Sequence, residues 1–479
     1  MFDVVIIGAG CVGAFVARKL SMYQLNVLVI EKENDVGNVT SMANSAIVHS
    51  GYDPVPGTLK AKLNVLGNKM YPEICRDLDV HFEQIGSLTV ALYDEQLPLL
   101  KELAKRSQQN GVEVKLLSAD EVKAMEPNIS PSVKGALLAP SAGIVNPFTL
   151  TVHAMENAVD QGVKLHLGEC VTNIKNNGDF FEVLTDKNQY QAKVVINCAG
   201  IYGDKIHAMV EPVDYEIKGR KGQYFVLDHY GKGLVNHVIF PLPSEKGKGI
   251  LVSPTTSGNY IVGPSSEWVD DKDDLSCDKD TLVNVRQQAT DMVPNIPFNQ
   301  VIRIFAGNRP TPSTHDFVIG FSKSSKNFIN ASGIESPGLV SSPAIAEYVV
   351  NDFVSQVLSL KKKDNWSGKV RPRVHMDKLS VEERNALIKK EPAYGRIICN
   401  CEKVSLGEIL DELDRSVPPH TVKALKKRTR AGFGKCQGGF CQPQVIQILA
   451  EKYHLALSDV KYDKDGSTIC QYPTKGEEK

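Results

Sequence analysis

The sequence predicts an α/β protein, α+β over its whole length, with a Rossmann-like domain first and a small helical four-cysteine domain last. Three observations support this fold class. A glycine fingerprint near residue 10 lies between two short apolar runs, as in a strand–helix–strand unit. Further along, short apolar runs separated by Gly, Pro, Ser and Asn predict an antiparallel sheet. Near the other end, two tight cysteine pairs lie in glycine-rich sequence.

The N-terminal motif is G-x-G-x-x-G. Its glycines are Gly8, Gly10 and Gly13. The apolar run 4–7 before it is typical of a buried parallel strand, and an apolar-periodic helix follows through Leu20. Such glycines let the backbone approach a pyrophosphate, and the helix N-terminus supplies amide donors. A second strand over 26–30 leads to Glu31, which is expected to accept a hydrogen bond from a ribose hydroxyl. An acid there argues against a 2′-phosphate and leaves FAD or NAD.

Three later segments favour FAD. The run 40–51 is rich in hydroxyl and amide groups and is expected to be a loop that lines the cofactor. The buried strand 194–198 ends in a small-residue turn that suits a chain passing beneath the adenosine end. Strand 327–330 leads into a glycine turn and a helix from Pro343, which offers amides and a dipole to an electron-rich ring. The expected cofactor-binding residues are Gly8, Gly10, Gly13, Glu31, Thr40, Ser41, Asn44, Ser45, Gly200, Gly307, Gly333, Pro337, Gly338 and Leu339.

The C-terminal cysteines form a C-x-C pair and a C-x4-C pair. They are Cys399, Cys401, Cys436 and Cys441. Four-cysteine sets of this kind hold iron–sulfur clusters, which exchange electrons singly. Zinc is one alternative, although zinc sites usually show C-x2-4-C spacing in both pairs, and unrelated thiols are another. The spacing favours an iron–sulfur cluster.

Composition limits the remaining classes of function. The chain has 479 residues, 42% of them apolar, and a formal net charge of -1, which favours two or three domains and gives no sign of nucleic-acid binding. No apolar run reaches the roughly 18 residues of a membrane helix, although peripheral membrane contact stays open. The chain enters a strand directly after Met1, which leaves no room for a signal peptide. The other cysteines show no pairing pattern, so we expect a cytoplasmic protein.

Residues 1–360 resemble the D-amino-acid-oxidase-like superfamily of flavoproteins, and within it the branch of glycerol-3-phosphate oxidases and dehydrogenases and L-2-hydroxyglutarate oxidases. The resemblance rests on segments 43–51, 56–62, 220–224, 247–254, 258–264, 306–310 and 336–339. Ala46 departs from the pattern, because relatives often carry Gly there. The cysteine region resembles the bacterioferritin-associated-ferredoxin type of 2Fe-2S domain, and the combination looks like the catalytic subunit of anaerobic-type glycerol-3-phosphate dehydrogenases.

This resemblance implies FAD and a 2Fe-2S cluster as cofactors and a discontinuous first domain. The expected segments are FAD-binding 1–85, 145–210 and 305–360; substrate-domain insert 86–144 and 211–304; linker 361–394; 2Fe-2S domain 395–455; and tail 456–479. In the insert we expect strands at 217–228, 238–241, 249–252 and 260–262, and helices at 97–109 and 276–292. Further helices are expected at 380–389, 404–413 and 443–453.

Oxidation of a secondary alcohol on a flavin needs a base for the hydroxyl proton and cations for an anionic substrate. His49 is the base candidate, since it titrates near neutrality and lies in the loop expected to reach the flavin; a structural histidine is the alternative. Arg309 is expected to follow a strand at 301–305 and can fork onto a phosphate or carboxylate, or form an interdomain salt bridge. Spacing alone makes Lys248 a solvated turn residue, whereas the resemblance places it at the substrate and also implicates Ser336.

The prediction is an FAD-dependent dehydrogenase that oxidises sn-glycerol 3-phosphate to dihydroxyacetone phosphate, with hydride passing to flavin N5. The cluster would relay electrons to an acceptor protein or partner subunit. One alternative is L-2-hydroxyglutarate oxidation, because Arg309 can equally bind a carboxylate. An alternative of another class is an electron-transfer module without a small-molecule substrate.

Overall fold

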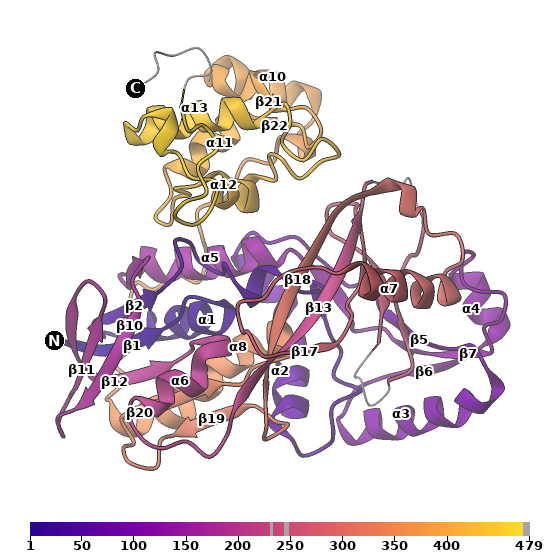
Figure 1. Cartoon of the computed structure of the whole chain (residues 1–479), viewed down its shortest axis with the longest axis horizontal. Helices are drawn as coiled ribbons and strands as arrows, with labels where there is room; N and C mark the ends of the chain where they lie inside the picture. The colour runs from indigo at the N-terminus through magenta and orange to yellow at the C-terminus, as the bar shows by residue number, and fades with distance from the viewer. Residues whose placement is uncertain (230–232, 244–248, 473–479) are drawn as a thin grey trace.

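The computed structural model describes residues 1–229, 233–243 and 249–472. Two large β-sheets and their helices form the main body, and a smaller helical domain lies on it (Figure 1). This arrangement confirms the predicted fold class. Among the described residues, no helix is both long and apolar enough to cross a bilayer.

The first sheet has eight strands with a parallel centre. β12, β1, β2 and β9 pair in parallel, β20 pairs in parallel with β12, and β10, β11 and β19 add antiparallel pairings. The strands are β1 (Phe2–Ile7), β2 (Val27–Glu31), β9 (Lys164–Leu167), β10 (Val171–Asn176), β11 (Phe181–Thr185), β12 (Gln189–Asn197), β19 (Val318–Phe321) and β20 (Phe328–Ser332). Val4, Ile6 and Val29 are fully buried, as a parallel sheet covered on both faces requires.

Four helices of this part pack against one another beside the first sheet. They are α1 (Cys11–Leu20), α2 (Leu59–Asp77), α5 (Pro147–Asp160) and α8 (Gly338–Val349). α1 lies against both α5 and α8, and α2 lies against α8. One apolar core therefore joins segments from the beginning, the middle and the end of the body.

The second sheet has nine strands and is antiparallel except for the pairing of β14 with β5. Its strands are β5 (Ser87–Ala91), β6 (Lys115–Ser118), β7 (Gly135–Ala139), β13 (Ile217–Leu227), β14 (Val238–Pro241), β15 (Leu251–Pro254), β16 (Tyr260–Gly263), β17 (Glu267–Val269) and β18 (Val301–Pro312). Helices α3 (Leu97–Gln109), α4 (Ala119–Met125) and α7 (Lys279–Met292) belong to this part. A small third sheet joins β3 (Ile47–Val48), β8 (Gly143–Val145) and β4 (Phe82–Glu83).

Two predicted boundaries were wrong in ways that matter for the site. The strand expected to end at residue 305 continues to Pro312 as β18, so Arg309 lies within a strand and not after one. Pairing with β13 along the whole length carries the strand through Gly307 and Pro310. The helix expected from Pro343 begins at Gly338 as α8.

Smaller shifts occur elsewhere. The helix expected from residue 276 begins at Lys279, because the Asp278 side chain caps it by accepting from the Thr281 backbone N–H. The helix expected from residue 404 begins at Leu406, after the short strand β22 (Val404–Ser405).

The segment after the body runs along its surface. The Gln24 backbone N–H donates to the Lys361 carbonyl at 2.8 Å, and the Lys363 N–H donates to the Met22 carbonyl at 2.8 Å. The Asn157 side-chain amide donates to the Ser367 carbonyl at 3.0 Å. Residues 361–369 are therefore fastened to the body before α10 (Val381–Lys390) begins.

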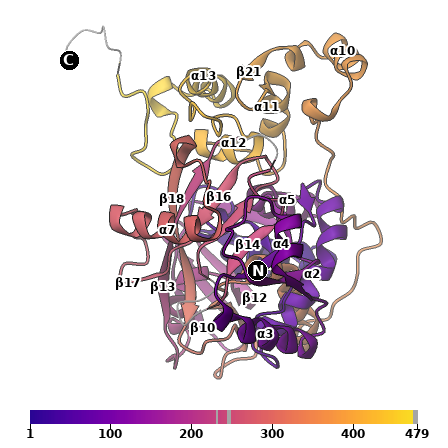
Figure 2. The same ribbon diagram turned by 90° about the vertical axis from the view of Figure 1, so that its right-hand side faces the viewer.

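The C-terminal domain has a core of its own. Its elements are η7 (Pro392–Gly395), β21 (Ile397–Cys399), β22, α11 (Leu406–Leu413), α12 (Val422–Thr429) and α13 (Gln442–Tyr453). Ile409, Leu425 and Leu449 are fully buried in it. Figures 1 and 2 both show this domain above α5, with α12 facing the main body.

A buried ionic cluster joins the C-terminal domain to the main body. Asp35 follows the second Rossmann strand, and its carboxylate lies 2.6 Å from Lys427 Nζ and 2.8 Å from Arg428 Nη2. All three side chains are at most 3% exposed. Burial would raise the pKa of Asp35, but the two cations outweigh it and hold the pKa well below its usual range. A second buried pair links Glu156 on α5 to Arg415 at 2.9 Å.

Asp35→Asn should loosen this docking. The substitution leaves two buried cations without their shared counter-charge, and breaking a buried pair in this way typically costs about 3–5 kcal/mol. We expect a lower midpoint of thermal unfolding and new protease cleavage within 361–394. Because the pKa of Asp35 is lowered on folding, its contribution is present above the ordinary value of 3.8 and is lost only as the pH falls through the lower folded value.

Lys193→Ala is the matched control. Lys193 forms an exposed pair with Asp3 at 2.7 Å, and pairs of this kind contribute about 0–1 kcal/mol. Equal unfolding midpoints and equal protease resistance for Asp35→Asn and the unsubstituted protein would contradict the docking role.

Candidate functional site

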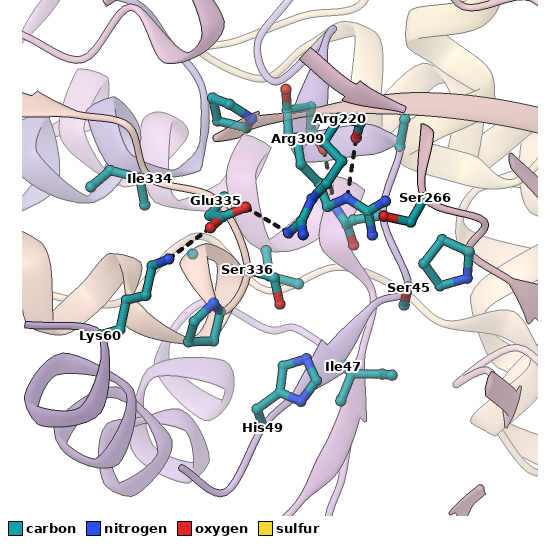
Figure 3. Close-up of a pocket in the computed structure, with 18 of the residues that line it drawn as sticks. Ser45, Ile47, His49, Lys60, Arg220, Ser266, Arg309, Ile334, Glu335 and Ser336 are labelled. Atoms are coloured by element: carbon teal, nitrogen blue, oxygen red, sulfur yellow. Dashed lines mark hydrogen bonds and ion pairs between the residues drawn. The ribbon is translucent and has the colours of Figure 1, made fainter. Parts of the chain in front are cut away.

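A cavity of about 610 Å³ is bounded by elements of both large sheets. Its lining includes the start of α1, the loop 40–49, the paired strands β13 and β18, and the turn before α8. Figure 3 shows side chains of the loop, of β13 and β18 and of the turn before α8 around one space. The volume lies in the range of sites for small ligands and cofactors.

The Rossmann turn at one end of the cavity fits a pyrophosphate. Gly8 has a φ of +106°, and a Cβ there would lie 2.4 Å from the Cys198 carbonyl oxygen. A Cβ on Gly13 would lie 2.0 Å from the Gly8 carbonyl oxygen, so helix and strand pack more closely than a side chain permits. Gly10 precedes α1 without a side-chain cap and lines the cavity. The N-terminus of α1 therefore faces the cavity, where its amides could hold a phosphate group.

Glu31 lies at the end of β2, where the ribose acceptor was predicted. Its Oε2 accepts from the Ala9 backbone N–H at 2.6 Å, and its Oε1 accepts from the Glu33 N–H at 2.9 Å. Burial raises the pKa of this carboxyl. Each carboxylate oxygen can accept a second hydrogen bond, so this arrangement is compatible with a ribose hydroxyl.

The loop after β2 lines the cavity as expected, but some of its polar groups shape the loop itself. The Asn44 amide donates to the Ser41 carbonyl at 2.8 Å, and its Oδ1 accepts from the Ala46 N–H at 2.8 Å. The Thr40 hydroxyl donates to the Asn308 carbonyl at 2.9 Å. Ala46 has a φ of +59°, a backbone conformation that favours glycine.

The other predicted cofactor residues fall into two groups. Ser41, Ser45, Gly200, Pro337, Gly338 and Leu339 line the cavity. Gly307 and Gly333 do not line the cavity. A Cβ on Gly307 would lie 2.2 Å from the Ala43 carbonyl oxygen, and one on Gly333 would lie 2.7 Å from the Pro312 ring. These two glycines therefore allow close packing of the segments that form the wall.

His49 and Ser336 both line the cavity. The His49 ring centre lies 5.8 Å from that of Phe240, and its backbone carbonyl accepts from the Asn64 amide at 2.7 Å. Figure 3 shows His49 on the side of the cavity away from the two arginines, with Ser336 between them. Lys248, the remaining predicted catalytic residue, lies outside the described residues.

Arg309 lies directly across from Arg220 in the register of β18 and β13. Its Nε donates to the Arg220 carbonyl at 3.1 Å, and its Nη2 donates to the Ser265 carbonyl at 2.8 Å. Burial lowers the pKa of its guanidinium. Like charges directly opposite one another are destabilising in a sheet, so this arginine pair needs a counter-charge.

The sequence analysis missed that counter-charge, which is Glu335. Its carboxylate accepts from Lys60 Nζ at 2.7 Å, from Arg220 Nη2 at 2.7 Å and from the Thr311 hydroxyl at 2.6 Å. The side chain is 7% exposed. Burial would raise its pKa, but the two cations lower it below the usual value. The sequence held two signals: Glu335 lies between the predicted site residues Gly333 and Ser336, and Lys60 and Arg220 lie in motifs shared with the resembled family.

The four predicted ligand cysteines meet in two pairs. Cys401 Sγ lies 3.8 Å from Cys436 Sγ, and the thiols of Cys399 and Cys441 form a hydrogen bond. Within the described ranges, no three His, Cys, Asp or Glu side chains surround one position for a single metal ion. Two sulfur pairs suit a dinuclear cluster better than tetrahedral zinc, because each of its two irons takes two protein ligands.

Backbone amides converge on one of these sulfurs. The hydrogen bond from Cys441, and then backbone N–H groups of Gly432, Glu402 and Cys401, lower the pKa of Cys399 to about 5. Gly434 packs against Cys401, one of the predicted ligands, since a Cβ there would lie 2.2 Å from Cys401 Cβ. The loops therefore favour a thiolate and leave room for no further side chain at this point.

Cys436→Ser should remove the cluster and leave the flavin. The substitution replaces one of four thiolates, so we expect iron content and visible cluster absorbance to fall severalfold while FAD content is unchanged. Cys470→Ser is the control, because Cys470 is an exposed thiol in the tail. Full iron content in Cys436→Ser would exclude it from the ligand set.

Comparison with known proteins agrees with this geometry. The model of the FAD dependent oxidoreductase family matches residues 3–351, and that of the BFD-like 2Fe-2S binding domain matches residues 397–451.

Relatives and solved structures give the same picture. The chain is 46% identical over 478 residues to a glycerol 3-phosphate dehydrogenase of Caloramator mitchellensis, which covers 100% of both chains. It is 30% identical to a mitochondrial L-2-hydroxyglutarate dehydrogenase of Arabidopsis thaliana, over 74% of this chain and 83% of that one. A solved L-alpha-glycerophosphate oxidase of Mycoplasma pneumoniae with FAD bound has a TM-score of 0.74 and 31% identity, and covers 78% of this chain and 99% of its own. The chain belongs to the FAD dependent oxidoreductase family and carries a BFD-like 2Fe-2S binding domain, with FAD and a 2Fe-2S cluster as its cofactors.

Proposed function

We propose that this protein is a dehydrogenase that oxidises sn-glycerol 3-phosphate to dihydroxyacetone phosphate. The observation that carries the proposal is the single cavity that joins a phosphate-binding helix terminus, a histidine and a cation-rich wall. The full-length similarity to the glycerol 3-phosphate dehydrogenase of C. mitchellensis supports the choice of substrate.

In this proposal the residues of the cavity divide the work. His49 accepts the proton of the substrate hydroxyl as oxidation proceeds. Arg309, whose guanidinium is fixed by backbone carbonyls, binds the phosphate together with Lys248. Ser336, which lies between His49 and Arg309 in Figure 3, donates a hydrogen bond to substrate or cofactor. Bound FAD supplies the hydride acceptor.

The cluster domain is proposed to pass electrons on to an acceptor protein or partner subunit. Two features support this. The domain is docked through buried ion pairs, and its ligand Cys401 is exposed at the surface. The solved oxidase of M. pneumoniae covers only 78% of this chain, so part of this chain has no counterpart in it.

We also propose a cytoplasmic location, because no cysteine within the described ranges forms a disulfide.

Oxidation of L-2-hydroxyglutarate is the second candidate function. It is favoured by the similarity to the A. thaliana dehydrogenase and by Arg309, which can also bind a carboxylate. A protein that only transfers electrons would respond to neither small alcohol.

Anaerobic bleaching of the flavin tests these functions. We expect sn-glycerol 3-phosphate to reduce the flavin rapidly and L-2-hydroxyglutarate to reduce it slowly or not at all. In His49→Asn the rate with the phosphate substrate should fall about a hundredfold or more, the usual contribution of a general base, while FAD stays bound.

The opposite substrate preference would move the protein to the hydroxy-acid branch. An undiminished rate in His49→Asn would remove His49 from the proton-transfer role, and reduction by a protein donor alone would favour electron transfer only.

A further inference from the structure

Lys60, Arg220 and Arg309 form the cation wall of the cavity, and each has hydrogen-bond donors that the described residues do not use. In the part of the chain that the structure describes, the Arg220 side chain donates only from Nη2, to Glu335. Arg309 donates from Nε and Nη2. Lys60 Nζ donates to Glu335 and to the His315 carbonyl, two of its three N–H groups. All three cations line the cavity, so each has donors to offer a ligand.

The wall also carries an excess of positive charge. Of the charged side chains that line the cavity, Lys60, Arg106, Arg220 and Arg309 contribute four positive charges, and Asp53, Glu267 and Glu335 contribute three negative ones, which leaves one positive charge (4 − 3 = 1). Glu267 accepts from the Ser265 hydroxyl at 2.6 Å and from the Ser266 N–H at 3.0 Å, and it forms no ion pair within the described residues. An anionic ligand group is therefore electrostatically favoured at this wall.

A purely structural role would not explain this arrangement. Two arginines stand opposite each other in a sheet, and burial makes the charge of Arg309 costly. One carboxylate, Glu335, holds both Lys60 and Arg220 at 2.7 Å. Figure 3 shows Glu335 between these two side chains, with Arg220 beside Arg309. The carboxylate fixes two flexible cations in one orientation and leaves their remaining donors available.

We propose that Lys60, Arg220 and Arg309 together bind the terminal oxygens of the substrate phosphate, and that Glu335 is the positioning residue that holds Lys60 and Arg220 for this contact. The three cations come from three elements, α2, β13 and β18. A tetrahedral phosphate offers three terminal oxygens in three directions, whereas a carboxylate offers two in one plane. Three cations from three directions therefore suit a phosphate better than a carboxylate, and Glu335 contributes by holding two of them. This inference rests on the proposed function.

Glu335→Gln in the FAD-loaded full chain tests the proposal. The amide can accept from only one of the two cations and turns an N–H₂ group towards the other. Hydrogen bonds to charged groups contribute enough that losing one should raise the KM for glycerol 3-phosphate about tenfold or more. The dissociation constant of inorganic phosphate, measured by calorimetry, should rise equally. The kcat should stay within about threefold, because His49 is untouched.

Two further variants complete the experiment. Glu347→Gln is the control. Glu347, on α8, pairs with Lys19 of α1 at 2.7 Å and does not line the cavity. The KM for glycerol 3-phosphate and the dissociation constant of inorganic phosphate should both match those of the unsubstituted protein. Arg220→Lys keeps the charge but loses the forked guanidinium, and it should weaken phosphate binding severalfold with normal flavin content. If Glu335→Gln fails to fold, phosphate binding by Arg220→Lys tests the proposed phosphate site instead.

Unchanged phosphate binding in Glu335→Gln, or in Arg220→Lys, would overturn the proposal. A lower kcat with unchanged KM would also overturn it, because Glu335 would then act on the chemistry and not on binding. The two proposals fail separately. If glycerol 3-phosphate does not reduce the flavin but Glu335→Gln still weakens inorganic phosphate binding, the substrate is wrong and the phosphate site stands.

Discussion

The antiparallel pairing of β13 with β18 is the constraint on which the cavity depends. Its register runs from Ile217 opposite Pro312 to Leu227 opposite Val301. This register places Arg220 opposite Arg309 and brings the Asn308 carbonyl to the Thr40 hydroxyl of the cofactor loop. Because a shift of one residue would turn each side chain to the other face of the sheet, one pairing fixes both the cation wall and its distance from the loop.

Buried charges recur at the two places where parts of the molecule must be held in one orientation. Glu335 holds Lys60 and Arg220 at the cavity, and Asp35 holds two cations of α12 at the domain junction. Buried ion pairs add little net stability, because desolvation offsets most of their attraction. They do penalise every arrangement in which a charge loses its partner. Here that penalty favours a single cavity geometry and a single docking geometry.

Local sequence patterns predicted the parts of the structure that depend on local physics. The glycine fingerprint, the acid after β2 and the two cysteine pairs each follow from a few neighbouring residues. Arg309 was expected to follow a strand that ends at residue 305, whereas pairing with β13 carries the strand through Gly307 and Pro310, residues that are uncommon inside a strand. Glu335 was missed because its partners lie 275 and 115 residues away in sequence. No periodicity reports a contact of that kind.

The segment that follows β2 makes contacts with both the Rossmann turn and the C-terminal domain, and so joins the two predicted cofactor sites. Lys427 of the cluster domain donates to the Val36 carbonyl at 3.1 Å and to Asn38 Oδ1 at 3.2 Å. Between these residues, the Gly37 N–H donates to the Ala9 carbonyl of the Rossmann turn at 3.0 Å. The same segment then continues into the loop that lines the cavity.

A second bridge lies beside it, where the ring centres of Phe148 on α5 and Phe433 in the cluster loop are 5.5 Å apart. A tilt of the C-terminal domain would therefore disturb the hydrogen bonds of Lys427 to the segment that contacts the Rossmann turn. It would also disturb the contact between Phe148 and Phe433. Any motion that separated the two sites would have to break buried charge pairs first. The separation between the sites is consequently a property of the folded chain, set by the same residues that shape each of them.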